Sequence, residues 1–295
     1  MTHGSLDALH ALAERHLPSD VAARWLGLLR PAARLTAAHD TASGEGGQAY
    51  GSVGQLGGTP ELPTSWDWPA WEGHGPLAFI ASVDCAALPG GLDIALPGEG
   101  RLLFFYFDGQ VDDGDALVIA GDRESWAGAR VLYVPAGVEV SARETPAELE
   151  PYPAVPLTAR TEMTSVDRWH PLAGEVFAPG APAAQPQENP AWAEAFLDAL
   201  EEVDTSIGHQ IGGHARPVQN TVELEIASAV LEGKVGWDDP RLVEEAGGWL
   251  LLAQIDSDSA AGMMWGDVGT LYWLIRPRDL AERRFDRAMF TWQCC

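Results

Sequence analysis

The chain has 295 residues and a formal net charge of −25 at pH 7, because 43 acidic residues outnumber 18 basic ones, of which only Lys234 is a lysine. This charge disfavours nucleic acid and anionic lipid as partners, since their recognition requires clustered basic side chains. The hydrophobic content of 46% and the 12 tryptophans indicate a folded globular protein. We therefore expect no nucleic-acid or membrane partner, and an attraction for cations, including a basic protein.

The sequence also bears on the compartment in which the protein works. No run reaches the ~18 consecutive apolar residues that cross a bilayer. Residues 1–20 are amphipathic and acidic, without the apolar core or cleavage site of a signal peptide. The three cysteines, Cys85, Cys294 and Cys295, make neither a disulfide framework nor a spaced zinc motif. These features predict a cytoplasmic protein.

Taken in chain order, the first expected elements are two short helices that form a hairpin within residues 1–36. Ser5 and Ser19 are placed to cap these helices, and Pro31 is expected to stop the second one. Residues 37–64 are rich in Gly, Ser and Thr, which predicts a loop with at most a short strand. Three residues of this loop fit a dinucleotide fingerprint formally, but no hydrophobic strand precedes them and no amphipathic helix follows.

The remaining chain is expected to contain two groups of strands with helices between them. A Pro- and Ala-rich stretch, residues 174–190, is interpreted as the connection between the groups. Helices are expected to begin near Asn189, Asn220 and Asp239. The expected strands are residues 77–83, 101–107, 116–120, 129–135 and 137–143, followed by 249–255, 270–275 and 286–293.

The two groups of strands share one outline. Gly57-Gly58 corresponds to Gly212-Gly213, and Ala81-Ser82-Val83-Asp84 corresponds to Ala253-Gln254-Ile255-Asp256. The second copy differs mainly by two helices inserted before its first long strand. We predict an α+β fold of internally duplicated, mostly antiparallel β-sheet halves, with peripheral helices and an N-terminal helical hairpin. The predicted units are the hairpin (1–36), the first β-rich repeat (37–173), the connection (174–190) and the second repeat (191–295).

Four stretches carry a resemblance to a known family. They are Gly57-Gly58 with Pro60, Pro63 and Trp68-Pro69, then "HQIGGHARPVQ" from His209, "LLLAQIDSD" from Leu250 and "WGDVGTLYWLIRPRDL" from Trp265. Together they resemble the YwqG-like family of bacterial proteins, from about Gly46 to the C-terminus. The resemblance implies an α+β fold with duplicated antiparallel sheets. It implies little about function, because the family is a domain of unknown function, associated only loosely with toxin–immunity systems. The chain departs from the family at Ser82, where the first copy tends to have Gln.

Three carboxylates follow the second Ala-Gln-Ile-Asp strand. Asp256, Asp258 and Asp267 have a spacing reminiscent of a calcium loop, although the glycine and the last ligand of such a loop are misplaced. Carboxylates so close together repel one another unless they are solvated, hydrogen-bonded or neutralised by a cation. The sequence therefore leaves open a loose divalent metal site at these residues, or a turn in which their side chains accept backbone amides.

A second candidate region lies around Gly212-Gly213. It concentrates imidazole and amide side chains where glycines allow close approach to a ligand, namely those of His209, Gln210, His214 and Gln219. The histidines are five residues apart in an irregular segment, which is not the spacing of a helical zinc pair. The alternative is a tight turn that packs against the other repeat.

Aromatic residues complete the predicted ligand site. Trp66 and Trp68 follow the first Gly-Gly pair, and Trp265 lies in the acidic loop of the second copy. A two-fold arrangement of the copies would place them around a shared groove, although aromatics this dense are also typical of a core. The full predicted ligand-binding set is Trp66, Trp68, His209, Gln210, His214, Gln219, Gln254, Asp256 and Trp265.

Standard catalytic signatures are mostly missing from the sequence. It has no Gly-x-Ser-x-Gly elbow, no phosphate-binding loop and no Ser-x-x-Lys. Cys85 is interpreted as a small buried hydrophobe, and Asp256 with His209 is the preferred acid/base pair if the protein is an enzyme. The leading hypothesis is a non-catalytic, immunity-like or regulatory protein that holds a basic protein on an acidic surface. The alternative is a small-molecule-binding protein or enzyme that uses a groove between the repeats. No particular cofactor is predicted.

Overall fold

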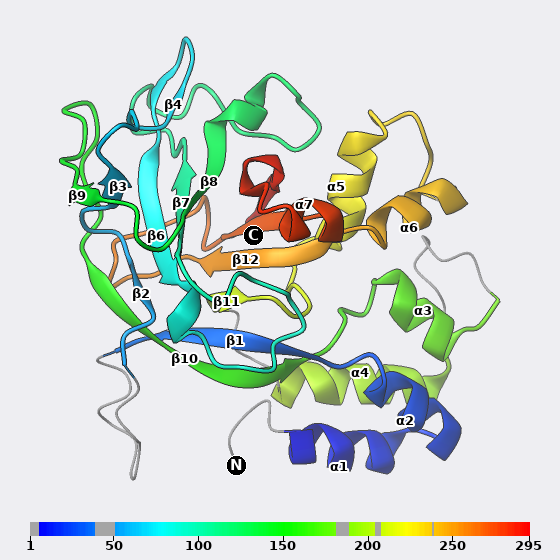
Figure 1. Ribbon diagram of the computed structural model, residues 1–295. Coiled ribbons are helices and arrows are strands. Elements are labelled where there is room, and N and C mark those ends of the chain that lie inside the picture. Colours follow the sequence, from blue (N-terminus) through cyan, green and yellow to red (C-terminus); the bar gives the residue numbers. More distant parts are fainter. Residues whose placement is uncertain (1–5, 39–50, 181–188, 204–207, 238) are drawn as a thin grey trace.

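The computed structural model describes residues 6–38, 51–180, 189–203, 208–237 and 239–295 (Figure 1). One ten-stranded antiparallel sheet, in the order β14-β13-β12-β11-β1-β10-β2-β6-β7-β8, dominates the fold. Its strands are β1 Arg30–Ala37, β2 Gly54–Leu56, β6 Ala78–Asp84, β7 Arg101–Tyr106, β8 Ala129–Val134, β10 Val155–Thr164, β11 Gln210–Ile211, β12 Leu250–Asp256, β13 Thr270–Ile275 and β14 Met289–Gln293. Two small ribbons pair β3 Glu61–Pro63 with β9 Val140–Ala142, and β4 Ala70–Trp71 with β5 Gly75–Pro76. The predicted α+β class with mostly antiparallel strands is confirmed.

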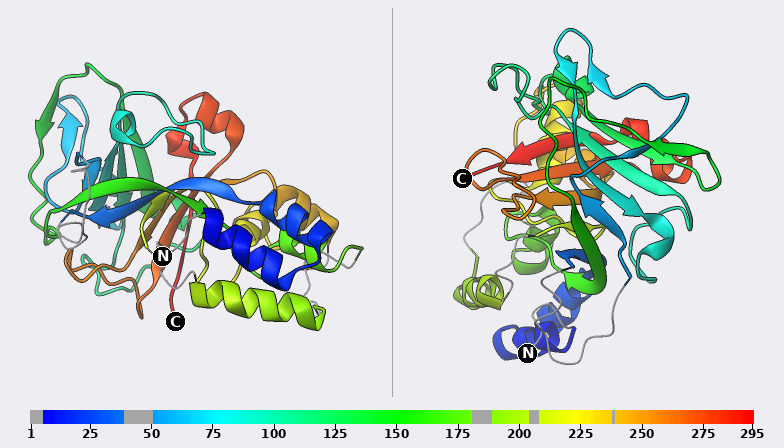
Figure 2. Two further views of the ribbon diagram at one scale, coloured as in Figure 1. Left: turned by 90° about the horizontal axis from the view of Figure 1, so that it is seen from below. Right: turned by 90° about the vertical axis from the view of Figure 1, so that its left-hand side faces the viewer.

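The sheet bends until strands that are far apart in its order face one another, as the two views of Figure 2 show. Phe104 in β7 lies with its ring centroid 5.1 Å from that of Trp273 in β13. Tyr106 in β7 lies 4.9 Å from Phe290 in β14. These aromatic side chains belong to one buried cluster that the two ends of the sheet share, so both groups of strands build a single core.

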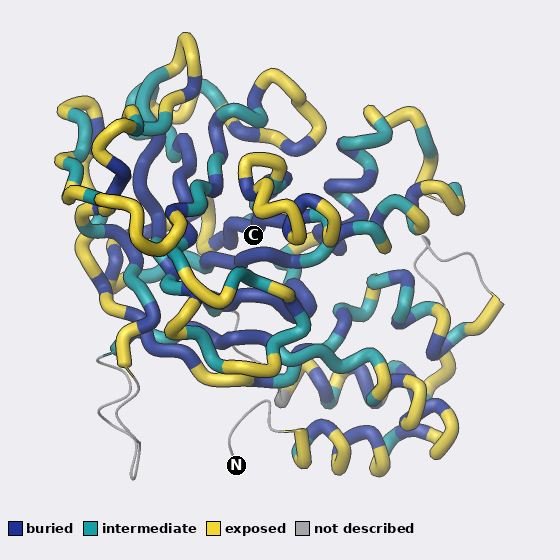
Figure 3. Tube along the Cα trace, in the orientation of Figure 1, coloured by how far each residue is buried: buried dark blue, intermediate teal, exposed yellow. Residues whose placement is uncertain are grey.

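The helices form two groups around the sheet. The first group has its own hydrophobic core, with Trp25 packed edge-on against Phe196 at 4.8 Å. It consists of α1 Leu6–His16, α2 Ser19–Leu26, α3 Pro171–Phe177 and α4 Ala191–Val203. The other helices are α5 Val222–Val230, α6 Pro240–Ala246 and α7 Pro277–Ala281. Figure 3 shows how α1 buries one side and exposes the other. Among the described residues, no helix is long and apolar enough to span a membrane.

The N-terminal helices are shorter than the predicted hairpin. Helices α1 and α2 contact each other, and α1 also contacts α4. The backbone N–H of Gly27 caps α2, and the chain then enters β1, so residues 30–36, predicted as part of the hairpin, lie in a strand. Pro31 is therefore the second residue of β1 rather than a helix terminator.

The two strands at the centre of the sheet, β1 and β10, are absent from the predicted strands. Conversely, the strand expected at 116–120 does not form. There the hydroxyl of Ser125 accepts the N–H of Ile119 at 2.9 Å and donates to its carbonyl at 3.0 Å. A side chain thus satisfies the backbone groups that a neighbouring strand would otherwise bind.

The strand order is the same when read outward from either side of the β1–β10 pair. Next to β1 lie β11, β12, β13 and β14; next to β10 lie β2, β6, β7 and β8. The register of β6 shifts between Phe79 and Ala81, and that of β12 shifts between Leu251 and Ala253. At the centre, Thr36 faces Thr158, with their hydroxyl oxygens 3.2 Å apart. Four strands thus flank the central β1–β10 pair on each side, in chain order from the centre outward.

Candidate functional site

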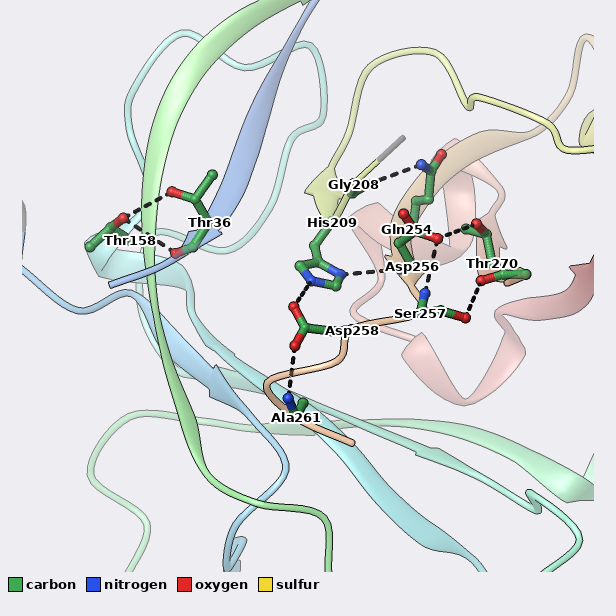
Figure 4. A network of polar contacts seen from close by, with 11 residues as sticks. Thr36, Thr158, Gly208, His209, Gln254, Asp256, Ser257, Asp258, Ala261 and Thr270 are labelled. Carbon is green, nitrogen blue, oxygen red and sulfur yellow. Dashed lines mark hydrogen bonds and ion pairs between the residues drawn. The ribbon is translucent and has the colours of Figure 1, made fainter. Parts of the chain in front are cut away.

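His209 lies immediately before β11, next to the end of β12, and both of its ring nitrogens are engaged (Figure 4). The backbone N–H of Asp256 donates to Nδ1 at 3.1 Å. The neutral imidazole consequently carries its proton on Nε2, which lies 3.3 Å from the Asp258 carboxylate. The other oxygen of Asp258 accepts the N–H of Ala261 at 2.7 Å. The imidazole is thus held in one orientation by the turn after β12.

The two carboxylates beside this ring have different environments. The Asp256 carboxylate accepts the Ser257 N–H and the Thr270 hydroxyl, each at 2.9 Å, and burial raises its pKa. The hydrogen bond from His209 lowers the pKa of Asp258 to about 2. The predicted acid/base pair of Asp256 and His209 therefore meets through the backbone of Asp256, and the carboxylate that contacts the ring is that of Asp258.

The third predicted aspartate, Asp267, does not lie beside His209. Asp267 is exposed, and its backbone oxygen accepts the N–H of Cys295 at 3.2 Å. In the part of the chain that the structure describes, no group of three or more His, Cys, Asp or Glu side chains is arranged to hold a metal ion. Asp256 and Asp258 thus lie on either side of His209 as turn-forming residues, while Asp267 lies apart from them.

The pKa values of the two aspartates are shifted in opposite directions, so their replacement is expected to have effects of different size. The lowered pKa of Asp258 means that its stabilisation is complete above its ordinary value of 3.8 and is lost as the pH falls through about 2. We expect Asp258→Asn to lower the free energy of unfolding by about 1–2 kcal/mol at pH 7, and by little near pH 2. Asp256→Asn should cost less at pH 7, because burial opposes that charge. Urea unfolding of both variants at both pH values measures this; equal losses at pH 7 would contradict it.

Gln210 and Gln254 are fully buried cross-strand neighbours on one face of the sheet. The Gln210 amide donates to the carbonyls of Gly212 at 3.1 Å and His214 at 2.7 Å. The Gln254 amide oxygen accepts the N–H of Arg216 at 2.9 Å, and its nitrogen donates to the carbonyl of Gly208 at 3.0 Å. These two glutamines fasten the Gly-Gly segment to the sheet, so they act on the protein's own backbone.

The side chains of His214 and Gln219 also bind backbone carbonyl groups of the protein itself. His214 is buried, with Nε2 2.8 Å from the carbonyl oxygen of Leu28, and burial lowers its pKa to about 4. The Gln219 amide donates to the carbonyl of Cys294 at 2.6 Å. Of the predicted ligand-binding residues, Gln219 also lines a cavity that is described below.

The predicted tryptophans have separate surroundings. Trp68 donates its Nε1 hydrogen to the carbonyl of Leu77 at 2.8 Å and packs edge-on against Phe105. Trp66, half-buried, accepts a hydrogen bond from Arg143 through its carbonyl at 2.7 Å. Trp265 is buried, with its ring 5.9 Å from that of Tyr106 and 5.8 Å from that of Tyr152. These contacts are those of core aromatics.

The cavities were not predicted from the sequence. Their lining residues come from segments that are far apart in the chain and that share no sequence motif. One cavity of about 520 Å³ lies between α4 and the segments 165–169 and 215–219. Asp167 in its wall accepts the Thr221 hydroxyl at 3.0 Å and the N–H of Trp169 at 2.8 Å. Burial raises the pKa of Asp167 to about 6 and that of Glu223 to about 7. Such buried carboxyl groups are common at ligand sites, although nothing in the local sequence marks them.

Two further cavities adjoin each other on the opposite half of the sheet. Their volumes are about 460 and 210 Å³, and Glu61, Asp84 and Arg101 line both of them. The only sequence signal for these two cavities is the repetition of the Gly-Gly pair and of the aspartate that ends the following strand.

A model of the family described as a domain of unknown function (DUF1963) matches residues 54–294. The chain belongs to this family. The DUF1963 match begins at β2 and ends just after β14, so it contains every strand of the large sheet except β1. All residues that line the 520 Å³ cavity, and all but Ser52 in the 460 Å³ cavity, lie within the DUF1963 region. No curated protein matches the sequence.

The cysteine of the DUF1963 region that the sequence singled out, Cys85, is buried as expected. Burial raises the pKa of its thiol to about 12, so the thiol is protonated at neutral pH and is a poor nucleophile. Cys85, Cys294 and Cys295 are all free.

Proposed function

We propose that this DUF1963 protein is a non-catalytic binding protein that holds a basic protein partner on its acidic surface, in an immunity-like or regulatory role in the cytoplasm. The observation that carries the proposal is the internal use of the basic side chains. Most of those in the described chain already form ion pairs with the protein's own acids. Arg168 alone contacts Glu194, Asp198 and Glu201. The net charge of −25 therefore leaves a large excess of acids for an external partner.

The scaffold for this function is proposed to be an internal duplication of the YwqG-like type. The matching strand order, the register shifts in β6 and β12, and the contact of Thr36 with Thr158 support an approximate two-fold axis at the centre of the sheet. The positive φ angles of both Gly-Gly pairs, 53° and 73° at Gly57 and Gly58, 69° and 73° at Gly212 and Gly213, support the same relation.

The test is capture of partners from native lysate on the immobilised protein, followed by elution with salt. We expect a basic protein to be retained at about 20 mM salt and released by about 500 mM, because screening weakens attraction between surface charges. An unrelated protein of equal size and negative charge, immobilised in parallel, controls for simple ion exchange. If every basic protein retained by this chain is also retained by the control, the proposal fails.

A second candidate function is small-molecule binding or catalysis, and the 520 Å³ cavity favours it. Asp167, Arg168 and Gln219 supply polar groups beside apolar Leu197 and Leu200, which is a usual composition for a ligand pocket. A thermal-shift screen of metabolites tests this candidate, with Leu200→Trp as the variant that fills the cavity. A hit that stabilises both proteins equally binds elsewhere.

A further inference from the structure

The segment that follows the Gly-Gly pair is held against the sheet in one half of the sheet but not in the other. In the second half, Gln210 and Gln254 face each other across β11 and β12 and hold this segment against the sheet. The positions that face each other across β2 and β6 in the first half are Gln55 and Ser82. The Gln55 amide donates to the carbonyl of Gly57 at 2.7 Å, as the Gln210 amide does to Gly212. Ser82 is too short to repeat the contact that Gln254 makes.

The space left by the shorter side chain is a cavity. After Gly57-Gly58 the chain runs through Thr59 and Pro60 into β3, which pairs with β9 rather than with the large sheet. The 460 Å³ cavity lies between these residues and the sheet, and Gln55, Ser82 and Asp84 are among its lining residues. In the second half the backbone N–H of Arg216 donates to the amide oxygen of Gln254 at 2.9 Å, so the corresponding segment is hydrogen-bonded to the sheet there.

The cavity is rich in hydrogen-bond acceptors and carries net negative charge. Asp84 accepts the N–H of Ala86 at 2.9 Å and retains further acceptor capacity. Glu61 forms an ion pair with Arg101, the one basic residue in the lining, so that two carboxylates face one guanidinium. Exposed Glu99 and Glu139 lie next in sequence to residues that line the adjoining cavity. A cation is therefore favoured over an anion here.

The adjoining 210 Å³ cavity extends the site with apolar surface. Val134, Val138 and Val140 line it together with the shared Glu61, Asp84 and Arg101. An occupant can thus place a charged group among the acceptors and an apolar group against the valines. This combination matches a peptide segment with a basic residue next to an apolar one.

We propose that the 460 Å³ cavity receives an arginine side chain of the basic partner, and that the adjoining cavity receives an apolar neighbour of that arginine. The inference rests on the proposed function for the source of the arginine. A guanidinium presents five N–H donors in one plane, which suits the oxygens of Gln55, Ser82 and Asp84 around it. Arg101 stays with Glu61 and closes one side of the site.

The experiment uses N-acetyl-arginine amide as a probe, titrated into the full chain and followed by backbone amide shifts in NMR. Ser82→Gln places in β6 the side chain that Gln254 has in β12, and so fills the cavity with a residue the fold already accommodates. Ser82→Ala is the matched control that leaves the cavity open. We expect Ser82→Gln and Asp84→Asn each to weaken binding at least about tenfold, and Ser82→Ala by less than about threefold.

Two further probes identify the ligand chemistry. N-acetyl-citrulline amide has the same shape without the charge, and we expect it to bind at least about tenfold more weakly. Agmatine represents a free small-molecule guanidine; binding of agmatine without binding of the blocked arginine overturns the assignment to a protein side chain. Equal binding of the blocked arginine to the wild type and to Ser82→Gln overturns the site itself.

Captured partners separate this inference from the proposed function. If the lysate yields a specific basic partner that binds Ser82→Gln as tightly as the wild type, the cavity assignment fails and the proposed function stands. If no partner is captured but the blocked arginine binds as expected, the proposed function fails while the cavity remains a guanidinium site. Thermal unfolding of each variant beforehand confirms that the comparison is made between folded proteins.

Discussion

Trp273→Ala is expected to lower the free energy of unfolding by about 3–5 kcal/mol, because it leaves a cavity at the contact between the two halves. The side chain is 1% exposed, and its ring lies 5.1 Å from those of both Phe104 and Phe290. It joins β13 to β7 across the bend of the sheet. Loss of the indole therefore removes packing from both halves at once.

Trp273→Phe is the matched control for this prediction. Among the residues that the structure describes, the indole Nε1 of Trp273 has no hydrogen-bond partner, so replacement by phenylalanine removes an unsatisfied donor together with some volume. We expect a loss below about 1.5 kcal/mol. Urea unfolding followed by tryptophan fluorescence and circular dichroism measures both variants. An alanine variant that loses less than the phenylalanine variant would show that the two halves do not depend on this contact.

Gly213→Ala is expected to cost about 3 kcal/mol or more, since strain and overlap occur together. Gly213 has φ of +73°, and a Cβ at this position would lie 2.6 Å from the Cβ of Ala32 and 2.6 Å from the hydroxyl oxygen of Thr164. Both neighbours belong to the central strands β1 and β10, which pair with each other from Arg30↔Thr164 to Ala37↔Leu157. The backbone N–H of Gly213 also donates to Asp93 at 2.8 Å, and a shift of the turn would weaken this bond.

Gly137→Ala separates the two causes. Gly137 has a similar φ of +79°, but nothing lies within 4 Å of the Cβ that alanine would add. We expect this variant to lose only about 1 kcal/mol, the cost of the left-handed conformation itself. Thermal unfolding of the two alanine variants under the same conditions makes the comparison. Similar losses would mean that the close approach at Gly213 relaxes without cost.

The outer strands of the sheet could be predicted from the sequence, but its centre could not. Strands β6, β7, β12 and β13 are rich in apolar residues, most of which are buried. The buried residues of strand β1 are mainly alanines. Strand β10 contains charged and hydroxyl side chains, a composition that is more typical of a loop. Its Glu162 is buried because Arg34 of β1 donates to it at 2.8 Å. A pair so far apart in the chain cannot be recognised before the two strands are known to be neighbours.

The candidate site shows a similar limit. The sequence paired His209 with Asp256; in the structure the ring contacts the backbone N–H of Asp256 and the carboxylate of Asp258, while Asp267 lies apart. Which carboxylate meets the ring depends on the turn, where Asp258 folds back so that its N–H donates to the Met263 carbonyl at 2.9 Å. For the cavity beside Ser82, the sequence showed the short side chain in place of a glutamine, but not that the segment after Gly57-Gly58 leaves the large sheet and so borders open space.

The strand pairing also has a consequence for the order in which the protein can assemble during synthesis. Strand β1 precedes the other strands in the chain, yet its two neighbours are β10 and β11, which pair with it through Ala33↔Thr161 and Ala33↔Ile211. Both of its edges therefore stay open while most of the chain is still being made. Contacts of such high sequence separation form slowly, and an unpaired strand edge invites association with other chains. Strand β1 thus waits longer for its partners than β6 waits for β7 or β12 for β13, which follow each other closely in the chain.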